Sequence, residues 1–283
     1  MAAGCRDARM NVECFAAIEY LIMNAKGQRV WITGASSGIG EALAHAFHQA
    51  GARLILSARR ADELSRVQQG CGGEAFTRIL PLDVTQPAAL PDKAREALQM
   101  FGGIDVLVNN AGVTQRSLVK DTDLEVYRTL MEVNFFGAVA LTKAVLPAMT
   151  EARNGHIVVI SSLVGKFGTP LRSGYAAAKH ALHGFFDSLR AEVTRYGVKV
   201  MLVCPGYIRT DISLHALRGD GSLHAKMDSG QARGMPVEQC AAQIMKGLAR
   251  GKEEIYVGEK DKYVIYLKRF FPGLFSRMIA RSG

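Results

Sequence analysis

Paired cysteines and clusters of metal ligands are both missing from this 283-residue chain. The cysteines are Cys5, Cys14, Cys71, Cys204 and Cys240. Their number is odd, their spacing is wide and no CxxC pair occurs, so we expect reduced thiols and a cytoplasmic or similarly reducing compartment. The histidines pair only as His45/His48 and His180/His183, without a third ligand nearby in the sequence. We therefore predict no metal site and interpret these four residues as unrelated surface or groove histidines.

The start of the chain lacks an apolar run long enough to cross a bilayer. Residues 12–23 are apolar there, but they number only 12 and include Glu13 and Glu19. A membrane-spanning helix needs about 20 apolar residues, and a signal peptide would have a basic start and a small-residue cleavage site. We expect residues 1–26 to be an extension of the main domain, either a short helix or a disordered tail.

An acidic excess is lacking too, because the formal net charge is +9. Six basic residues and one acidic residue fall between Lys260 and Gly283, so more than half of the basic excess lies in the last 24 residues. A basic chain can bind an anionic cofactor, a membrane surface or nucleic acid. No helix-turn-helix, zinc or RNA-binding signature is present, so we predict no nucleic-acid partner.

Low-complexity segments, repeats and linkers are absent as well, which favours one domain over residues 27–283. Short apolar runs occupy residues 29–33, 53–57, 78–82, 104–109, 156–161, 198–204 and 254–257. Helical patterns alternate with them at residues 41–50, 64–69, 88–101, 124–150, 175–196 and 241–250. This alternation predicts an α/β fold: a single doubly wound Rossmann domain with a mainly parallel seven-stranded sheet and helices on both faces. The irregular residues 207–236 are expected to form a substrate loop.

A glycine-rich turn, TGASSGIG at residues 33–40, follows the first apolar run and opens the first helix. Its small residues let the backbone approach a pyrophosphate, and the helix start turns N–H groups toward that charge. Such a turn can also serve packing alone, but its place favours a dinucleotide site. The residues assigned to that site are Gly34, Ser36, Ser37, Gly38, Ile39 and Gly40.

The second apolar run ends in Ser57-Ala58-Arg59-Arg60, with no acidic residue before Asp62. The residue about 20 positions after the glycines meets the adenosine ribose; an acid there suits NAD and an arginine suits NADP. A guanidinium binds phosphate well. The other interpretation is a solvated arginine pair at a helix start. We predict NADP(H) as the cofactor, bound by Arg59 and Arg60.

Tyr175 and Lys179 stand four residues apart on a predicted helix and therefore share a face. A nearby ammonium favours tyrosinate, and lowering the pKa of Tyr175 from about 10 to about 7 takes roughly 4 kcal/mol. We expect Lys179 and the charged nicotinamide ring of the oxidised cofactor to supply this together. Ser162, at the end of the fifth apolar run, can hold a carbonyl oxygen. This trio predicts proton transfer to a carbonyl group.

Together these residues resemble the short-chain dehydrogenase/reductase family, and the resemblance covers residues 27 to about 258. Further matches follow in the order of the family's motifs, at Asp83, Val84, Asn110, Ala111, Gly112, Asn134, Pro205, Gly206, Ile208 and Thr210. The resemblance implies that Asp83 and Val84 meet the adenine, that the Asn110–Gly112 segment lines the cofactor cleft and that the loop after Pro205 holds the nicotinamide amide.

The resemblance also implies the catalytic roles. Tyr175 would be the general acid in reduction and the base in oxidation, and Ser162 would position the carbonyl. Lys179 would lower the tyrosine pKa and contact the nicotinamide ribose, while Asn134 would keep a water in a proton relay. Within the family, residues 57–60 and 266–278 look like the subgroup of dehydrogenase/reductase family member 7 and, more distantly, 11β-hydroxysteroid dehydrogenase.

Residues 261–283 combine an apolar stripe at helical spacing with flanking Lys262, Arg269 and Arg277. Pro272 should break or kink this helix. One interpretation is a helix or helix pair packed over the active-site cleft or a neighbouring subunit. The other is a peripheral membrane contact with anionic lipid, which would make the protein membrane-associated.

We conclude from the sequence that the chain is an NADP-dependent carbonyl reductase or alcohol dehydrogenase, and that NADPH favours reduction. Pocket walls are expected from residues 114–119, 163–171 and 207–236. Apolar side chains among them suggest a steroid, lipid, aromatic or quinone-like substrate: Leu163, Val164, Phe167, Leu171 and Tyr207. The alternative is a non-catalytic NADP-binding scaffold or sensor. Family analogy further implies a homo-oligomer, a dimer or tetramer, formed through the two long helices.

Overall fold

The computed structural model describes residues 25–281, which form one seven-stranded sheet flanked by helices. All neighbouring strands are parallel, and their order is β3-β2-β1-β4-β5-β6-β7. The strands are β1 (Arg29–Thr33), β2 (Arg53–Ser57), β3 (Thr77–Ile79), β4 (Val106–Asn109), β5 (Gly155–Ile160), β6 (Val198–Pro205) and β7 (Glu254–Val257). The predicted Rossmann fold is confirmed, and the five inner strands are mainly apolar because helices cover both faces of the sheet.

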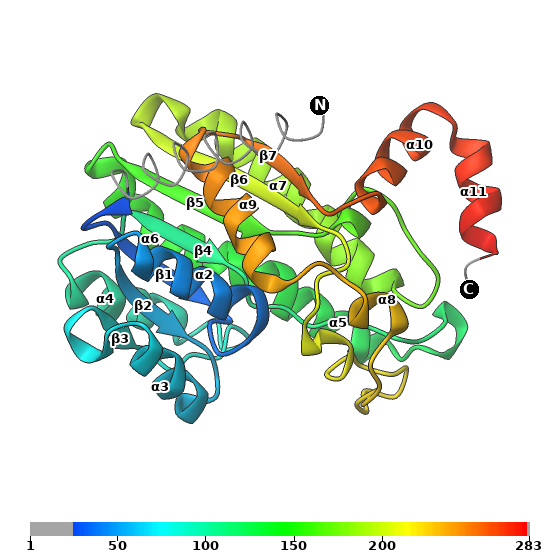
Figure 1. The fold of residues 1–283 in the computed structure, drawn as a ribbon, viewed down its shortest axis with the longest axis horizontal. Coiled ribbons are helices and arrows are strands. Elements are labelled where there is room, and N and C mark those ends of the chain that lie inside the picture. The colour runs from blue at the N-terminus through cyan, green and yellow to red at the C-terminus, as the bar shows by residue number, and fades with distance from the viewer. Residues whose placement is uncertain (1–24, 282–283) are drawn as a thin grey trace, which may run out of the picture.

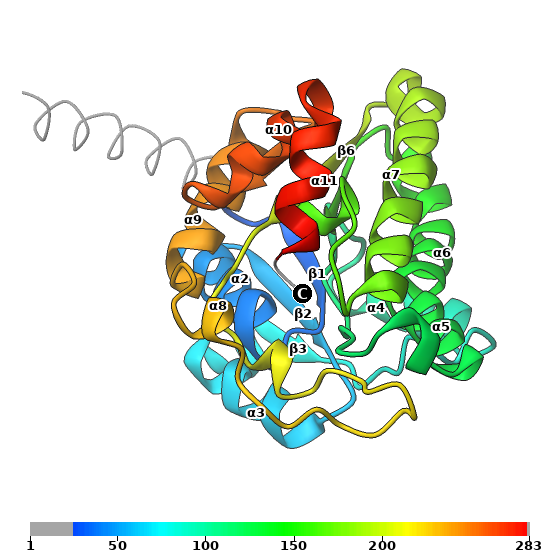
Figure 2. The ribbon, with the colours of Figure 1, turned by 90° about the vertical axis from the view of Figure 1, so that its right-hand side faces the viewer.

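One face of the sheet is covered by α2 (Gly38–Gln49), α3 (Ala61–Gly70) and α9 (Val237–Ala249) (Figure 2). The other face carries α4 (Leu90–Met100), α5 (Leu124–Met131), α6 (Gly137–Glu151) and α7 (Ser173–Val193). Two apolar cores result, one on each face. Phe47 and Ile244 belong to the first, and Trp31, Leu141 and Phe186 belong to the second.

The predicted helix over residues 124–150 is divided. A π-helical turn, Glu132–Phe136, separates α5 from α6. Hydropathy carries no mark of such a turn, so the sequence predicted one helix. Leu124–Glu151 is, among the described residues, the one helix long and apolar enough to span a membrane by length and composition. Its Leu130, Leu141 and Val145 are fully buried in the fold, so part of this apolar character serves the core.

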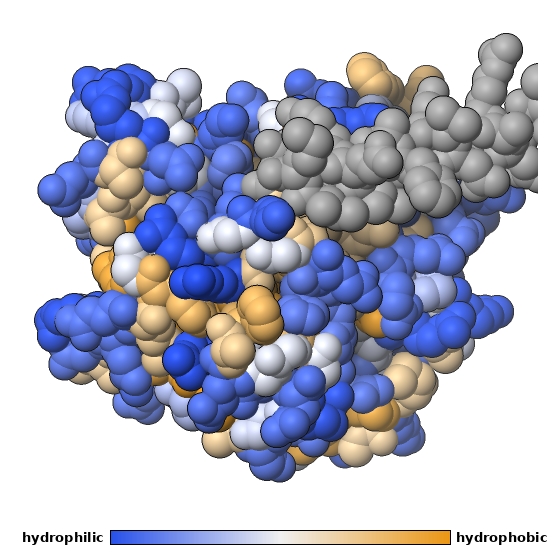
Figure 3. All heavy atoms as spheres, turned by 60° about the vertical axis from the view of Figure 1, so that its left-hand side comes forward, coloured by the Kyte–Doolittle hydropathy of each residue, from blue (hydrophilic) through white to orange (hydrophobic). Residues whose placement is uncertain are grey.

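The carboxyl ends of the strands point toward α8 (Ser229–Ala232), α10 (Val264–Phe270) and α11 (Pro272–Ala280), which lie together at one end of the molecule (Figure 1). The last two helices meet at Pro272, as predicted. The face at the opposite end is mostly hydrophilic, with apolar side chains interspersed (Figure 3). The predicted extension over residues 1–26 lies almost wholly outside the described residues.

Candidate active site

A cleft of about 790 Å³ opens at the carboxyl ends of the strands. It brings together, from segments spread over the chain, every predicted site residue except Gly40. The lining residues predicted from the sequence are Gly34, Ser36, Ser37, Gly38, Ile39, Arg59, Arg60, Asp83, Val84, Asn110, Ala111, Gly112, Asn134, Ser162, Tyr175, Lys179, Pro205, Gly206, Ile208 and Thr210. The cleft is therefore large enough for a dinucleotide fragment and a small substrate together.

The glycine-rich turn is packed too tightly for side chains. Gly34 and Gly38 have φ values of +62° and +59°, which favour glycine. A Cβ at Gly40 would lie 2.2 Å from the Gly34 carbonyl oxygen, so this position needs glycine although it does not line the cleft. The turn leaves the start of α2 open toward the cleft. This geometry fits a pyrophosphate held by backbone N–H groups.

Arg59 and Arg60 stand at the edge of the same cleft, beyond the end of β2. Arg60 Nη2 lies 3.4 Å from Ser36 Oγ, so the arginine pair and the glycine-rich turn are neighbours. Both arginines are exposed, and neither belongs to an ion pair of the described residues. Their guanidinium groups remain available to an anionic ligand.

Asn110 and Asn134 each donate side-chain hydrogen bonds to backbone carbonyl oxygens. The Asn110 side-chain amide donates to the carbonyl oxygens of Thr33 and Gly34, at 2.9 and 3.1 Å, and so ties β4 to the glycine-rich turn. Asn134 Nδ2 donates to the carbonyl oxygens of Val113 and Leu130, both at 2.9 Å. It lies in the π-helical turn, a feature that often marks functional sites.

Tyr175 and Lys179 project from α7 toward the end of β5, where Ser162 lies. Lys179 Nζ is 5.6 Å from the centre of the Tyr175 ring and donates to the Ile160 carbonyl oxygen at 2.8 Å. Burial lowers the pKa of Lys179 to about 8. The ammonium is therefore easier to deprotonate than an ordinary lysine.

The expected fall in the pKa of Tyr175 is not found in the protein alone. Desolvation raises this pKa, and it exceeds the opposing effects of the Ser162 hydrogen bond and the positive charges of Arg172 and Arg116. Lys179 is not among the groups that lower it. The predicted shift toward 7 combined Lys179 with the positive charge of an oxidised nicotinamide, so the pKa in the protein alone does not test it.

A small cavity of about 10 Å³ lies beside Asn134 and Lys179. Thr33, Asn109 and Ala111 also line it. Its volume matches roughly one water molecule, and polar groups are present to hold one. The arrangement fits a water between Asn134 and Lys179.

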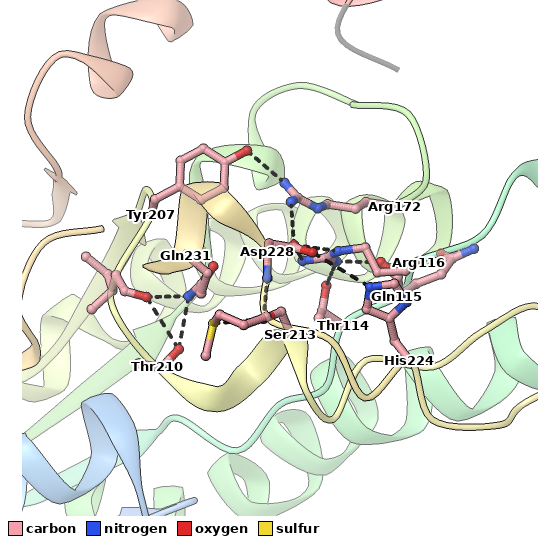
Figure 4. A network of polar contacts seen from close by, with 12 residues as sticks. Thr114, Gln115, Arg116, Arg172, Tyr207, Thr210, Ser213, His224, Asp228 and Gln231 are labelled. Carbon is pink, nitrogen blue, oxygen red and sulfur yellow. Dashed lines mark hydrogen bonds and ion pairs between the residues drawn. The ribbon is translucent and has the colours of Figure 1, made fainter. Parts of the chain in front are cut away.

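A charged network that the sequence reading missed lies at the substrate end of the cleft (Figure 4). Arg116 donates through Nε and Nη2 to Asp228 Oδ2, with the Nε contact at 2.7 Å. Arg172 Nη2 lies 3.4 Å from the same oxygen, and its guanidinium stacks 5.5 Å from the Tyr207 ring. Arg116 and Asp228 are 112 positions apart, so no local pattern could have paired them.

The carboxyl-terminal helices form part of the cleft wall. Val264, Met278 and Ile279 line the cleft, and the Phe275 ring packs 5.4 Å from that of Phe167. Asp261 lines it too. This placement agrees with the interpretation of a helix pair over the active site.

The predicted pocket walls are found where expected, because Leu163, Val164, Phe167, Leu171 and Tyr207 all line the cleft.

Asp261 connects the cleft wall formed by the carboxyl-terminal helices to the loop after Pro205. Its Oδ2 accepts a hydrogen bond from the Tyr207 backbone N–H at 3.0 Å. A Cβ at Gly206 would overlap the same oxygen, so glycine allows the carboxylate to approach the loop. The segment before α10 therefore helps to position the loop in which Ile208 and Thr210 lie.

His183 departs from the expectation of a surface or groove histidine. It is 8 % exposed, and its Nε2 lies 3.0 Å from Ser161 Oγ while its Nδ1 lies 3.6 Å from Glu254 Oε2. Burial and the nearby Lys166 ammonium lower its pKa to about 4. The expectation was wrong because i,i+3 spacing does not reveal which side of α7 faces the sheet.

Comparisons with known proteins agree with this geometry. A sequence profile described as short chain dehydrogenase matches residues 28–219. The chain is 42 % identical over 276 residues to dehydrogenase/reductase SDR family member 7B of Bos taurus, across 94 % of this chain and 85 % of that protein. It is also 42 % identical over 250 residues to dehydrogenase/reductase SDR family member 7 of Homo sapiens, across 86 % and 74 % of the two chains.

Solved structures show the same fold. A short-chain dehydrogenase from Streptomyces avermitilis is 30 % identical, with a TM-score of 0.77 over 91 % of this chain and 99 % of that one. A short-chain dehydrogenase/reductase from Burkholderia phymatum, solved in complex with NAD, is 23 % identical and has a TM-score of 0.78 over 88 % and 95 % of the two chains. The second likeness concerns the fold alone.

Proposed function

Since the chain belongs to the short-chain dehydrogenase/reductase family and is therefore an oxidoreductase, we propose that it uses NADP(H) to interconvert a carbonyl group and a secondary alcohol. The observation that carries this proposal is the convergence of Asn134, Ser162, Tyr175 and Lys179 in the cleft that also contains the glycine-rich turn. Hydride transfer is the chemistry that a bound nicotinamide supplies. The chain's own side chains hold the carbonyl and move the proton.

Tyr175 donates its hydroxyl proton to the carbonyl oxygen during reduction and removes the proton during oxidation. Ser162 holds that oxygen by a hydrogen bond, which fits its contact with the Tyr175 hydroxyl. A raised tyrosine pKa keeps the proton on Tyr175 at neutral pH, so reduction starts from the correct protonation state. Lys179, with a pKa near 8, and a water beside Asn134 would return the proton from solvent.

The cofactor would be held along the whole cleft. Gly34 and Gly38 would receive the pyrophosphate, Asp83 and Val84 the adenine, and the segment from Pro205 to Thr210 the nicotinamide amide. The preference for NADP(H) is supported by Arg59 and Arg60, which stand at the end of β2 and belong to no ion pair among the described residues. Because NADPH is kept reduced in cells, we propose reduction as the working direction.

The test of this proposal is thermal unfolding with NADP+, with NAD+ and without ligand. A ligand at about 100 times its dissociation constant adds roughly 2.7 kcal/mol to the free energy of unfolding. We expect NADP+ to raise the unfolding temperature more than NAD+ does, and Arg59→Ala to reduce that difference. A larger shift with NAD+ would overturn the NADP assignment, and no shift with either would favour a protein that does not bind a nicotinamide cofactor.

The outer side of α10 and α11 further suggests a membrane surface as a partner. Tyr263, Tyr266, Phe270, Phe271 and Leu274 are each at least half exposed. Exposed Arg269, Arg277 and Arg281 accompany them. Aromatic side chains with basic neighbours suit the interface of an anionic bilayer. The inner side of the same helices lines the cleft, so this contact would bring the active site near an apolar substrate.

A further inference from the structure

We propose that Arg172 selects the substrate by binding a carboxylate that the carbonyl compound carries beside its reacting group. The proposal deepens the proposed function and rests on it. It assigns the substrate to the oxo acids, and to the hydroxy acids in the reverse direction, with an apolar body. The argument depends on the difference between the two arginines that share Asp228 at the substrate end of the cleft (Figure 4).

Most of the N–H donors of Arg116 are bound within the protein. Its Nε and Nη2 donate to Asp228, and its Nη1 donates to the Gln115 carbonyl oxygen and to Thr114 Oγ1. Its side chain is only 7 % exposed. These four hydrogen bonds use most of the five N–H donors of the guanidinium, and little of the side chain is exposed to a ligand. Arg116 therefore holds the substrate loop through Asp228 and is a structural partner.

Few of the N–H donors of Arg172 are bound within the described part of the chain. Its two polar contacts, to Asp228 Oδ2 and to the Tyr207 hydroxyl, are both 3.4 Å long. A guanidinium has five N–H donors, so most of its hydrogen-bonding capacity is unused among the described residues. The side chain is 17 % exposed and lines the cleft. Its donors can therefore be reached from the space where a substrate would lie.

The charges at this point do not balance. Asp228 is, among the described residues, the one carboxylate within 4 Å of Arg172, and its Oδ2 already accepts two hydrogen bonds from Arg116. Asp261 also lines the cleft, but its carboxylate is bound by the backbone N–H groups of Tyr207 and Lys262. Two guanidinium groups thus share one carboxylate. Burial of an excess charge is costly, and an incoming anion would compensate it.

The position of Arg172 determines where such an anion would lie relative to Tyr175. Arg172 immediately precedes α7, and Tyr175 stands three residues further on the same helix. The positive charge of Arg172 is near enough to the Tyr175 hydroxyl to lower its pKa. A carboxylate on Arg172 would therefore hold the neighbouring carbonyl group close to Tyr175, and the apolar Leu163, Phe167 and Leu171 would receive the rest of the molecule.

The test compares matched pairs of substrates on the full-length enzyme with its reduced cofactor. The pairs are 2-, 3- and 4-oxo acids with phenyl or long alkyl groups, each beside its methyl ester. We expect kcat/KM to favour the acid at least about tenfold, the range of a charged hydrogen bond. Arg172→Gln should bring the ratio close to one, mainly through the KM of the acid, and Arg172→Lys should retain part of it.

The ratio between acid and ester isolates substrate binding, because both compounds use Tyr175 and any change in its pKa cancels. Arg195→Gln is the matched control: Arg195 is exposed and stacks on Tyr196, 4.8 Å from its ring centre. Esters reduced as well as their acids, or an acid preference that survives in Arg172→Gln, would overturn the inference. The inference would also be overturned if the enzyme reduced neutral ketones but none of the oxo acids. If the cofactor-bound enzyme reduced no compound at all, the result would contradict the proposed function itself.

Discussion

Replacing the hydroxyl of Tyr175 separates the chemical step from cofactor binding. Tyr175→Phe removes the hydroxyl and keeps the ring that Lys179 Nζ faces at 5.6 Å. We expect turnover to fall by about 10²–10⁴-fold, the usual contribution of a general acid, while the cofactor-induced shift in unfolding temperature remains. NADPH oxidation and thermal unfolding measure the two properties. Undiminished turnover would exclude Tyr175 as the acid, and a scaffold protein would show no turnover to lose.

His183 makes the stability of the fold depend on pH. Its pKa of about 4 in the folded chain lies below the ordinary value of 6.5, so between these values the unfolded chain binds a proton that the folded chain does not. The neutral ring therefore contributes full stability above about pH 6.5, and this contribution is lost as the pH falls toward 4. The groups that act on it are Lys166, Glu254, Asp187 and His180.

The measurement is the unfolding temperature of the wild type and of His183→Gln between pH 7.5 and pH 4.5, values that span the window in which a histidine normally titrates. Gln can still bond Ser161 but does not titrate. We expect the wild type to lose more stability than the variant on acidification. Parallel curves for the two proteins would show that His183 does not carry the pH dependence.

Contacts between residues close in the sequence could be predicted, whereas contacts between distant residues could not. Tyr175 and Lys179 are one helical turn apart, so their shared face could be predicted from spacing alone. Arg116 and Asp228 meet across 112 positions, and only the fold brings them together. The direction of the pKa shift of Tyr175 in the protein alone could not be predicted from the sequence, because it depends on burial as well as on neighbouring charges.

At the scale of elements, hydrophobic runs predicted the strands well and the helix interiors less completely. All seven strands were found: the five inner strands are buried on both sides and therefore mainly apolar, whereas the edge strands β3 and β7 are short and only partly buried. The π-helical turn Glu132–Phe136 could not be predicted, since it changes hydrogen bonding and leaves the apolar spacing intact. That turn contains Asn134, so an irregularity invisible in the sequence lies at the candidate active site.

The helix pair α10–α11 should bind anionic membranes through its exposed aromatic side chains. Phe270 and Phe271 are 68 % and 62 % exposed. We expect the double variant Phe270→Ser, Phe271→Ser to sediment less with phosphatidylcholine vesicles that contain phosphatidylserine, and wild-type binding to weaken with salt. The matched control is Phe76→Ser with Val119→Ser, because these residues are 51 % and 68 % exposed outside the helix pair.

Two results would contradict the membrane contact. One is equal sedimentation of the wild type and the Phe270, Phe271 variant. The other is equal loss in the control variant, which would indicate nonspecific apolar binding. Activity in solution on a water-soluble substrate should be retained in all three proteins, because neither phenylalanine lines the cleft.

At the scale of the whole molecule, apolar surface remains on the side covered by α6 and α7. Phe136 is 48 % exposed, and its ring lies 5.0 Å from that of Phe135, which in turn lies 6.1 Å from that of Phe185. The most apolar window of Leu124–Glu151 is only 33 % buried. This side therefore carries more apolar character than the packing of one chain uses, and apolar surface of this kind favours association between copies.

We expect the protein to form a dimer or tetramer through this side, so that light scattering after gel filtration gives a mass at least twice that of the 30.7 kDa chain. Phe136→Asp should release the monomer, because a charge on a buried symmetric interface is opposed by its own copy. Phe76→Asp is the control: this ring is 51 % exposed and lies against His48 on the other side of the sheet. A monomeric wild type, or an oligomer that persists in Phe136→Asp, would exclude α6 and α7 as the interface, whereas dissociation in Phe136→Asp alone would assign the association to them.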